Sequence, residues 1–296
     1  MVYSLDKVLQ ITDLSKHYDA ILFDVWGVIL DETESILPSV VDTINTLIKE
    51  KYVYFVSNAP IQSNILAKFL LKEGINVSAD HVITSGQMSR DLLFDPEYQK
   101  SIFGCTKSQV NIYRIHYDSP YRCLFDDLAV NYVEDIAMAD LILVTVRSQK
   151  PEVECKEIVT LYKKALQLNV PVLCVNPDLH VRGKDGNAYC SGYFSNLYKE
   201  MGGRVFFIGK PYPAIYNKVF ISGGLSKEKH KVLMVGDTLT TDIKGGIDVG
   251  ISTALVLTGN VATAIGQDSQ DVDVLHKVRL HCQLHDIFPN YLVSLL

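Results

Sequence analysis

The stretch AILFDVWGVIL, residues 20–30, decides how this sequence folds. Four apolar residues lead into a single acid, Asp24, and Gly27 follows three residues later. This order predicts a buried strand that ends in a tight turn, with a carboxylate at the carboxyl end of the strand. A carboxylate beside the backbone N–H groups of such a turn can attack an electrophile whose negative oxygens those groups hold. The residues alone leave a second interpretation open, in which Asp24 only caps a core strand.

The composition narrows the class of protein. The 296 residues are 48% hydrophobic and 21% charged, which is typical of a globular protein. The net charge of −6, without a basic block, argues against nucleic acid and anionic membranes as partners. Apolar runs such as residues 141–146 fall short of the roughly 18 residues that a membrane span needs. With no signal-peptide pattern, we expect a cytoplasmic protein whose six cysteines are free thiols.

Strand-like and helix-like segments alternate along the chain, which predicts an α/β protein with a parallel sheet. Pro38 is expected to begin a helix, and YVYFVS, residues 52–57, to form a second strand that ends at Ser57 and Asn58. A further helix should stop near Gly74. The side chains expected to point inward from the two helices are Val40, Val41, Ile44, Leu47 and Ile48, then Ile61, Ile65, Leu66, Phe69 and Leu70.

Residues 84–203 have longer and more polar loops between their predicted strands than the preceding part of the chain, and they form a candidate second domain. Strands are predicted at 110–115, 141–146 and 171–175, with a helix over 151–168. Residues 176–191 are polar and are expected to form a long loop, which is usually functional or mobile.

From Val205 onward the sequence again resembles the first part of the chain. VFFIGKP predicts an apolar strand that ends in Gly209, Lys210 and Pro211. VLMVGDTLTTDIKGG, residues 232–246, then predicts another strand, a turn at Asp237, and Asp242 at the start of a helix. Two carboxylates at such a turn suit a hard cation such as Mg²⁺. Helix capping by Thr241 or Asp242, and a solvated Lys210, remain the alternatives.

These segments together resemble a known superfamily. DVWGV, FVSNA, GKPYP and GDTLTTDI resemble, in order, the four motifs of the haloacid dehalogenase (HAD) superfamily. The GKP and TDI forms, TSG at 84–86, NPD at 176–178 and GISTALVLTG at 250–259 resemble its class IIA, which includes NagD-like and p-nitrophenyl phosphatases. Each motif alone is weak, but the ordered set is specific.

The resemblance implies a domain organisation. Asp24 and Ser57 are 33 residues apart, whereas Ser57 and Lys210 are 153 apart, so the insertion follows the second motif. In the family this is the position of the α/β C2 cap, whose closure excludes water from the active site. We therefore expect a Rossmann-like core at residues 1–83 and 204–296 and a C2 cap at 84–203.

The resemblance also implies the site residues. Asp24 would be the nucleophile that forms an aspartyl-phosphate, with Lys210 as the second catalytic residue. The phosphate-binding residues would be Trp26, Gly27, Ser57, Asn58 and Lys210. The Mg²⁺ ligands would be Asp24, the backbone carbonyl of Trp26 and Asp237, with Asp242 supporting the cation or Lys210. The substrate would be a small phosphorylated metabolite, and a homodimer is left open.

Trp26 departs from the family pattern. Phosphatases of the superfamily carry D-x-D in the first motif, and the second acid protonates the leaving group and activates water. An indole cannot exchange a proton near neutral pH, so general acid–base catalysis of roughly 10²- to 10⁴-fold would be missing. Three interpretations stay open: a phosphatase slow on alkyl phosphates or aided by a cap acid (Asp178, His180 or Asp185), a HAD enzyme of another reaction type, and a non-catalytic phospholigand-binding protein.

Overall fold

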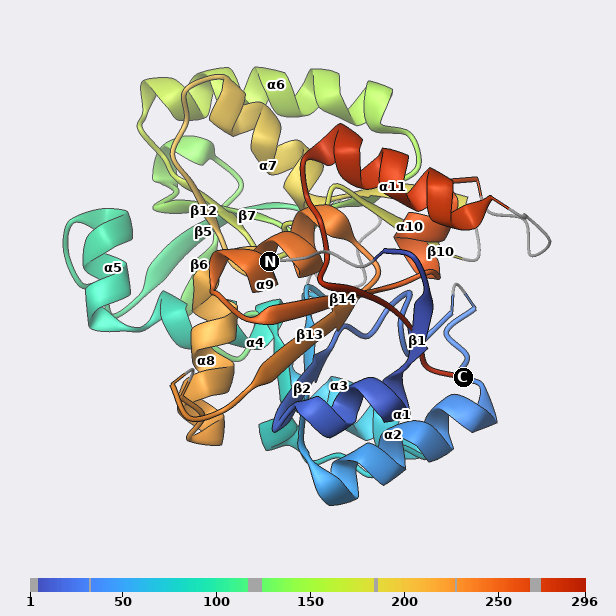
Figure 1. Cartoon of the computed structure of the whole chain (residues 1–296). Coiled ribbons are helices and arrows are strands. Elements are labelled where there is room, and N and C mark those ends of the chain that lie inside the picture. Colours follow the sequence, from blue (N-terminus) through green and yellow to red (C-terminus); the bar gives the residue numbers. More distant parts are fainter. Residues whose placement is uncertain (1–4, 32, 117–123, 184–185, 227, 267–272) are drawn as a thin grey trace. The chain divides into compact units, whose positions relative to one another are not determined.

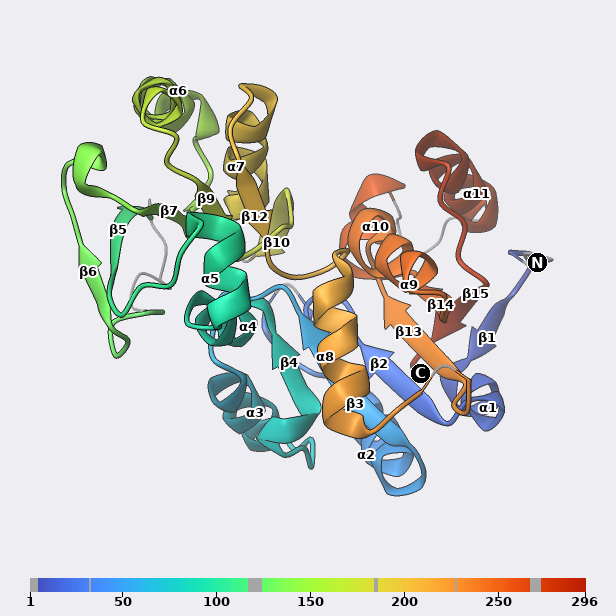
Figure 2. The same ribbon diagram turned by 90° about the vertical axis from the view of Figure 1, so that its left-hand side faces the viewer.

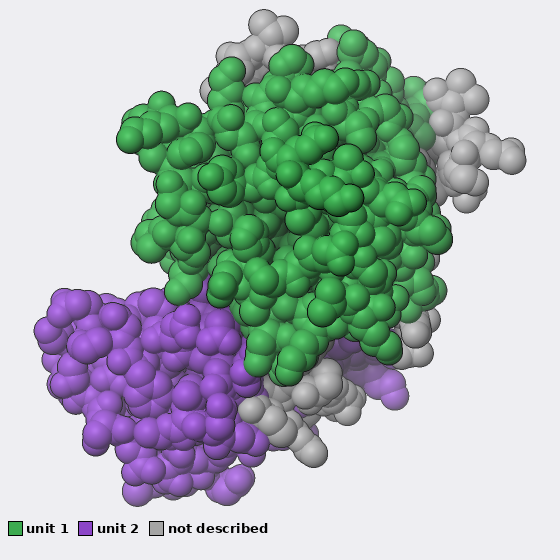
Figure 3. Space-filling model, turned by 90° about the horizontal axis from the view of Figure 1, so that it is seen from below, with its two compact units in different colours: residues 1–57, 63–83, 210–296 green, residues 58–62, 84–209 purple. Residues whose placement is uncertain are grey.

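The computed structural model describes all residues except 1–4, 32, 117–123, 184–185, 227 and 267–272 (Figure 1). The chain divides into two compact units, which Figure 3 shows in different colours. Unit 1 contains Met1–Ser57, Ser63–Ile83 and Lys210–Leu296, and unit 2 contains Asn58–Gln62 and Thr84–Gly209. Each unit has its own parallel sheet and its own buried core.

A seven-stranded sheet forms the centre of unit 1, in the order β1-β15-β14-β13-β2-β3-β4. Its strands are β1 (Val8–Gln10), β2 (Ala20–Phe23), β3 (Tyr52–Ser57), β4 (Val82–Thr84), β13 (Val232–Gly236), β14 (Ser252–Val256) and β15 (Tyr291–Ser294). Neighbouring strands from β1 to β3 run parallel. The central β2 is apolar throughout because helices cover both faces of the sheet. This arrangement confirms the predicted Rossmann-like α/β fold.

Helices α2 and α3 lie on one face of this sheet, and α8 and α9 lie on the other (Figure 2). The helices of unit 1 are α1 (Ile11–Leu14), α2 (Pro38–Glu50), α3 (Ser63–Lys72), α8 (Pro213–Gly223), α9 (Lys244–Asp248), α10 (Gly259–Ala264) and α11 (Val274–His285). Pro38 begins α2 as expected, because its fixed φ suits the first helical position. The inward face expected for α3 is partly wrong: Ile61 precedes the helix, and Ile65 is 52% exposed.

A second parallel sheet of five strands, in the order β12-β9-β7-β5-β6, forms the centre of unit 2. Its strands are β5 (Val110–Ile115), β6 (Val130–Tyr132), β7 (Leu141–Val144), β9 (Val172–Cys174) and β12 (Val205–Phe207), and the helices of the unit are α4 (Ser85–Leu93), α5 (Pro96–Phe103), α6 (Pro151–Gln167) and α7 (Ser191–Glu200). Tyr162 of α6 and Tyr198 of α7 are fully buried against this sheet. The strands and the long helix predicted for this part of the chain are therefore present.

Two expectations about this region are wrong. Residues 176–191 do not form one long loop, because β10 (His180–Gly183) and β11 (Gly186–Cys190) pair as an antiparallel hairpin that β8 (Arg147–Ser148) extends. Their polar composition hid a strand with alternating burial, in which Ala188 and Cys190 point inward. In addition, β12 pairs with β9 and so belongs to the sheet of unit 2. An apolar run predicts that a strand is buried, but it does not predict which of the two sheets the strand joins.

Among the described residues, no helix combines the length and the apolar character that a membrane crossing requires. Cys105, Cys155, Cys174, Cys190 and Cys282 are free thiols, and Cys123 lies outside the described residues.

The segment 58–62 is fastened to the first turn of α4 inside unit 2. Thr84 Oγ1 donates to the Ile61 carbonyl at 2.6 Å, and Ser85 Oγ lies 2.7 Å from the Asn58 carbonyl and 2.6 Å from that of Val175. A Cβ added to Gly86 would lie 2.4 Å from the backbone nitrogen of Ile61. The TSG motif therefore fits a close backbone approach, and it explains why these five residues pack with unit 2 and not with the core.

We expect Ser85→Ala to lower the free energy of unfolding by about 1–3 kcal/mol, because it removes a buried donor from carbonyl oxygens. Ser101→Ala is the matched control, because its hydroxyl bonds only within the exposed surface of α5 and should change stability by less than about 0.5 kcal/mol. Urea denaturation of both variants measures the difference. Equal effects would show that the Ser85 contacts do not hold the segment.

Candidate active site

Three polar residues lie at the carboxyl ends of three neighbouring parallel strands. Asp24 follows β2, Ser57 ends β3, and Asp237 follows β13, and β2 pairs with both of the other strands. Asp24 is 9% exposed, and Ser57 and Asp237 are each 1% exposed. These residues therefore share one edge of the sheet, as their positions in the sequence predict.

Lys210 brings two of the acids of unit 1 together. Its Nζ atom donates a hydrogen bond to Asp24 Oδ1 at 2.5 Å. It also lies 2.6 Å from Asp242 Oδ1, although that contact lacks the alignment of a hydrogen bond. The Lys210 side chain is only 2% exposed, so the interpretation of a solvated surface lysine is wrong.

Asp242 lies on a π-helical turn, Leu239–Ile243, that follows β13. Its Oδ2 atom accepts the backbone N–H of Thr238 at 3.1 Å, while its Oδ1 atom faces Lys210. One carboxylate thus accepts the N–H at the start of the turn and also faces the buried lysine.

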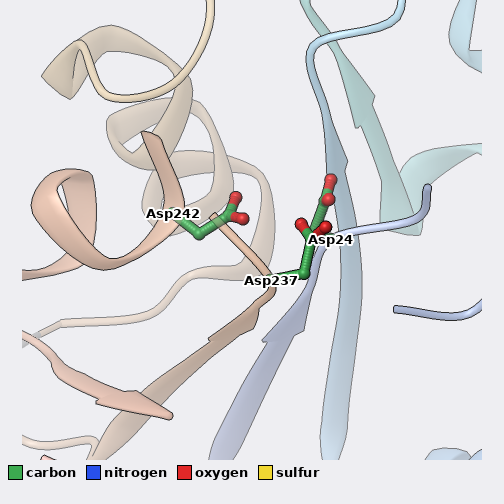
Figure 4. A group of neighbouring side chains, drawn as sticks. All are labelled: Asp24, Asp237 and Asp242. Atoms are coloured by element: carbon green, nitrogen blue, oxygen red, sulfur yellow. The ribbon is translucent and has the colours of Figure 1, made fainter. Parts of the chain in front are cut away.

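The carboxylates of Asp24, Asp237 and Asp242 face one another (Figure 4), and each offers an oxygen within 4.8 Å of the others. Three carboxylates against the one ammonium of Lys210 leave a formal charge of −2 in this cluster. Burial, and then the charges of Asp24 and Asp242, raise the pKa of Asp237 well above its ordinary value. A divalent cation would offset this repulsion, and an all-oxygen donor set suits Mg²⁺. The residues present therefore fit a magnesium ion.

The turn after Asp24 is closed by its own backbone. Gly27 N–H donates to the Leu30 carbonyl at 2.7 Å, and Gly27 has a φ of +86°, which favours glycine. A Cβ on Gly27 would lie 2.2 Å from Asp237 Oδ2, so only glycine lets the turn approach the acid this closely. Trp26, at the position of the missing second acid, is half-buried.

Asn58 and the acids proposed for the cap belong to unit 2. Asn58 Nδ2 donates to Asp178 Oδ1 at 2.8 Å, so Asp178 orients the amide of the second motif. His180 lies beside Tyr189, with ring centroids 4.6 Å apart, and partial burial lowers the pKa of its imidazole. Asp185 lies outside the described residues.

Thr238 and Asn260 hold Asp237, and the sequence analysis did not identify them. Asn260 N–H donates to Asp237 Oδ2 at 2.5 Å, and Thr238 Oγ1 donates to Asp237 Oδ1 at 3.0 Å. The GISTALVLTG motif ends one residue before Asn260, but the contact joins residues 23 apart across two strands. No spacing rule within one segment could have found it.

Two family models match the chain. The model described as haloacid dehalogenase-like hydrolase covers residues 21–113, and the HAD-hydrolase-like model covers 207–279. The chain is a haloacid dehalogenase-like hydrolase. The two matches contain the four motifs, and the part between them belongs to unit 2.

Characterised relatives and a solved structure agree with this assignment. The haloacid dehalogenase-like chain is 27% identical to an acid sugar phosphatase of Staphylococcus epidermidis over 82% of its length and 88% of the relative. It is 33% identical to the ribonucleotide monophosphatase NagD of Escherichia coli, over 29% of its length and 33% of that protein. A haloacid dehalogenase-like hydrolase from Brucella suis matches 86% of this chain and 91% of its own, with a TM-score of 0.70 at 27% identity. The chain is thus a phosphatase-like hydrolase of class IIA.

We expect Lys210→Met to lower the free energy of unfolding by about 3–5 kcal/mol, because it leaves Asp24 and Asp242 buried without their cation. Adding Asp242→Asn to this variant should recover part of the loss. Urea denaturation in EDTA measures both. Lys244→Met, which breaks the exposed pair with Asp248, should cost at most about 1 kcal/mol, and an equal cost at Lys210 would contradict the buried cluster.

Proposed function

We propose that the chain is a Mg²⁺-dependent phosphatase that hydrolyses a small phosphorylated metabolite through an aspartyl-phosphate at Asp24. The observation that carries this proposal is the buried contact of Lys210 with Asp24 and Asp242, beside Asp237 at the same edge of the sheet. A protein that only bound a phosphorylated ligand would have no need of a nucleophile. The sugar phosphatase and nucleotide phosphatase among the relatives support a small phosphorylated substrate.

Asp24 is suited to attack phosphorus. One carboxylate oxygen forms a bond to phosphorus as the bond from phosphorus to the leaving oxygen breaks, and water then cleaves the aspartyl-phosphate to return Asp24 and inorganic phosphate. Lys210 holds one Asp24 oxygen in place, and its charge would also stabilise negative charge on the phosphoryl oxygens. Ser57 and Asn58 would bind those oxygens. The Gly27 N–H, which the resemblance implied as a further donor, instead donates to the Leu30 carbonyl. Phosphoryl transfer needs mainly such positioning and charge.

Asp24 and Asp237, with the backbone carbonyl of Trp26, would hold the magnesium ion, and Asp242 would support the cation or Lys210. When bound, Mg²⁺ would neutralise negative charge on the phosphoryl group. The raised pKa of Asp237 supports this role, because it reports carboxylates buried together with too little positive charge.

Trp26 determines which substrates can react quickly. Its indole cannot protonate the leaving oxygen, so departure depends on how well that oxygen carries negative charge by itself. Without an acid at this position, the activation of water in the second step is also weaker. The proposal therefore requires either an activated leaving group or an acid from outside the first motif.

We expect Mg²⁺ to raise the melting temperature of the protein by several degrees, because a ligand present at 100 times its Kd stabilises the folded state by about 2.7 kcal/mol. Thermal unfolding with millimolar Mg²⁺ and with EDTA measures the shift. Asp237→Asn should lose the shift, whereas Asp42→Asn, on the exposed face of α2, should keep it. A wild-type protein without any shift would contradict the metal site.

We expect wild-type protein to hydrolyse p-nitrophenyl phosphate at least about 10²-fold faster than an alkyl sugar phosphate, because the phenolate needs no proton to leave. Trp26→Asp should raise the alkyl rate by about 10²-fold and change the aryl rate much less. Steady-state rates on both substrates measure this, with Asp24→Asn as the blank.

Equal wild-type rates on the two substrates would show that another group already acts as the acid. A Trp26→Asp variant that folds, responds to Mg²⁺ and yet hydrolyses neither substrate would favour a phospholigand-binding protein instead.

A further inference from the structure

The segment Thr258–Gly259–Asn260 lies where β14 leads into α10, and the mechanism above gives it no role. Its first two residues end the motif GISTALVLTG, which resembles a class IIA segment, and Asn260 follows directly. In the structure this segment touches both the turn after Asp24 and the carboxylate of Asp237.

Asn260 controls both oxygens of Asp237. Its backbone N–H donates directly to Oδ2 at 2.5 Å. Its side-chain Nδ2 donates to Thr238 Oγ1 at 2.8 Å, and Thr238 Oγ1 in turn donates to Asp237 Oδ1 at 3.0 Å. One residue therefore fixes the plane of the carboxylate, partly by itself and partly through Thr238.

The direction of this relay follows from its chemistry. The NH₂ group of an asparagine amide can only donate, so it occupies an acceptor position on the Thr238 oxygen. Thr238 has a single hydroxyl proton, and that proton is then directed at Asp237. Without the Asn260 amide the hydroxyl could rotate away, and Asp237 would keep only the backbone contact on Oδ2.

The rest of the segment fixes the distance between Asp237 and the turn after Asp24. Thr258 Oγ1 donates to the Gly27 carbonyl at 2.5 Å. A Cβ on Gly259, whose φ is +56°, would lie 2.0 Å from Asp237 Oδ2 and 2.6 Å from the Gly27 Cα. The segment is therefore packed against both groups without space for a larger residue.

We infer that Asn260 is a positioning residue for the cation site, acting on Asp237 through Thr238. This inference rests on the proposed Mg²⁺ site. Residues that orient a metal ligand typically change metal affinity by 10- to 100-fold when they are replaced. The Asn260 amide would act on the affinity for Mg²⁺ and not on the reacting phosphoryl group, so its removal would change the Mg²⁺ requirement more than kcat.

The test measures Mg²⁺ binding to the folded protein by calorimetry for wild type, Asn260→Ala, Thr238→Val and the double variant. Asn260→Ala keeps the backbone N–H and removes only the amide, and it should raise the Mg²⁺ Kd by about 10-fold or more. The double variant should bind no more weakly than Thr238→Val alone, because the two residues act in series. Asn64→Ala, at an exposed position on α3, is the matched control.

Two further readouts separate positioning from a structural role. The melting temperature of Asn260→Ala in EDTA should match that of wild type, and its kcat at saturating Mg²⁺ should fall by less than about threefold. An unchanged Mg²⁺ Kd, or losses that add in the double variant, would overturn the inference while leaving the proposed function intact. Absence of Mg²⁺ binding in wild type would overturn the proposed metal site, and the inference with it.

Discussion

The contact of the Lys210 ammonium with Asp24 and Asp242 is the constraint on which the core site depends. Asp24 and Lys210 are 186 residues apart in the sequence, and the whole of unit 2 except residues 58–62 lies between Thr84 and Gly209. An unpaired ammonium or carboxylate would be too costly to bury, so each of these groups can be buried only because the others are present. Residues 1–57 and 210–296 of unit 1 must therefore come together before Asp24 and Lys210 can pair.

Lys210 does not satisfy the cluster completely. Its charge balances one of three carboxylates, and Asp237 receives hydrogen bonds from Thr238 and Asn260. Hydrogen bonds from neutral donors orient the Asp237 carboxylate without adding positive charge. The negative charge of the cluster therefore remains. A site built to accept a cation needs such residual charge, together with a fixed orientation. The two glycines at positions 27 and 259 allow the backbone to approach Asp237 closely enough for this arrangement.

The sequence predicted most of this fold because its signals are local. The strand that leads to Asp24, the start of α2 at Pro38 and the strand that leads to Asp237 depend on runs and spacings of a few residues. The positions of Asp24, Ser57 and Asp237 after predicted strands indicated one shared edge of the sheet, since parallel strands present their carboxyl ends together. This rule does not account for Lys210, because the strand before it, β12, belongs to the other sheet.

The errors arise where a residue's environment depends on distant parts of the chain. Residues 205–207 have the composition of a core strand, yet β12 pairs with β9, because either sheet can accept an apolar edge strand. Ile65 fits the helical period of α3 but lies at the edge of its buried stripe. Asn58 follows Ser57 directly, but the contacts with Ser85 and Asp178 place it in unit 2. Pairing between segments, and not composition, decides each of these cases.

Trp26 can be understood in terms of the same charge balance. An acid two residues after Asp24 would add a further carboxylate to a region where three already share one lysine. A tryptophan there avoids that repulsion, but under the proposed function it would also give up the proton that an alkyl leaving group needs. The charged groups that would hold phosphate and cation lie on other residues, so the proposed mechanism would lose proton transfer at this position and keep its charged groups. Under that proposal, Trp26 would act on the choice of leaving group more than on whether phosphate can bind.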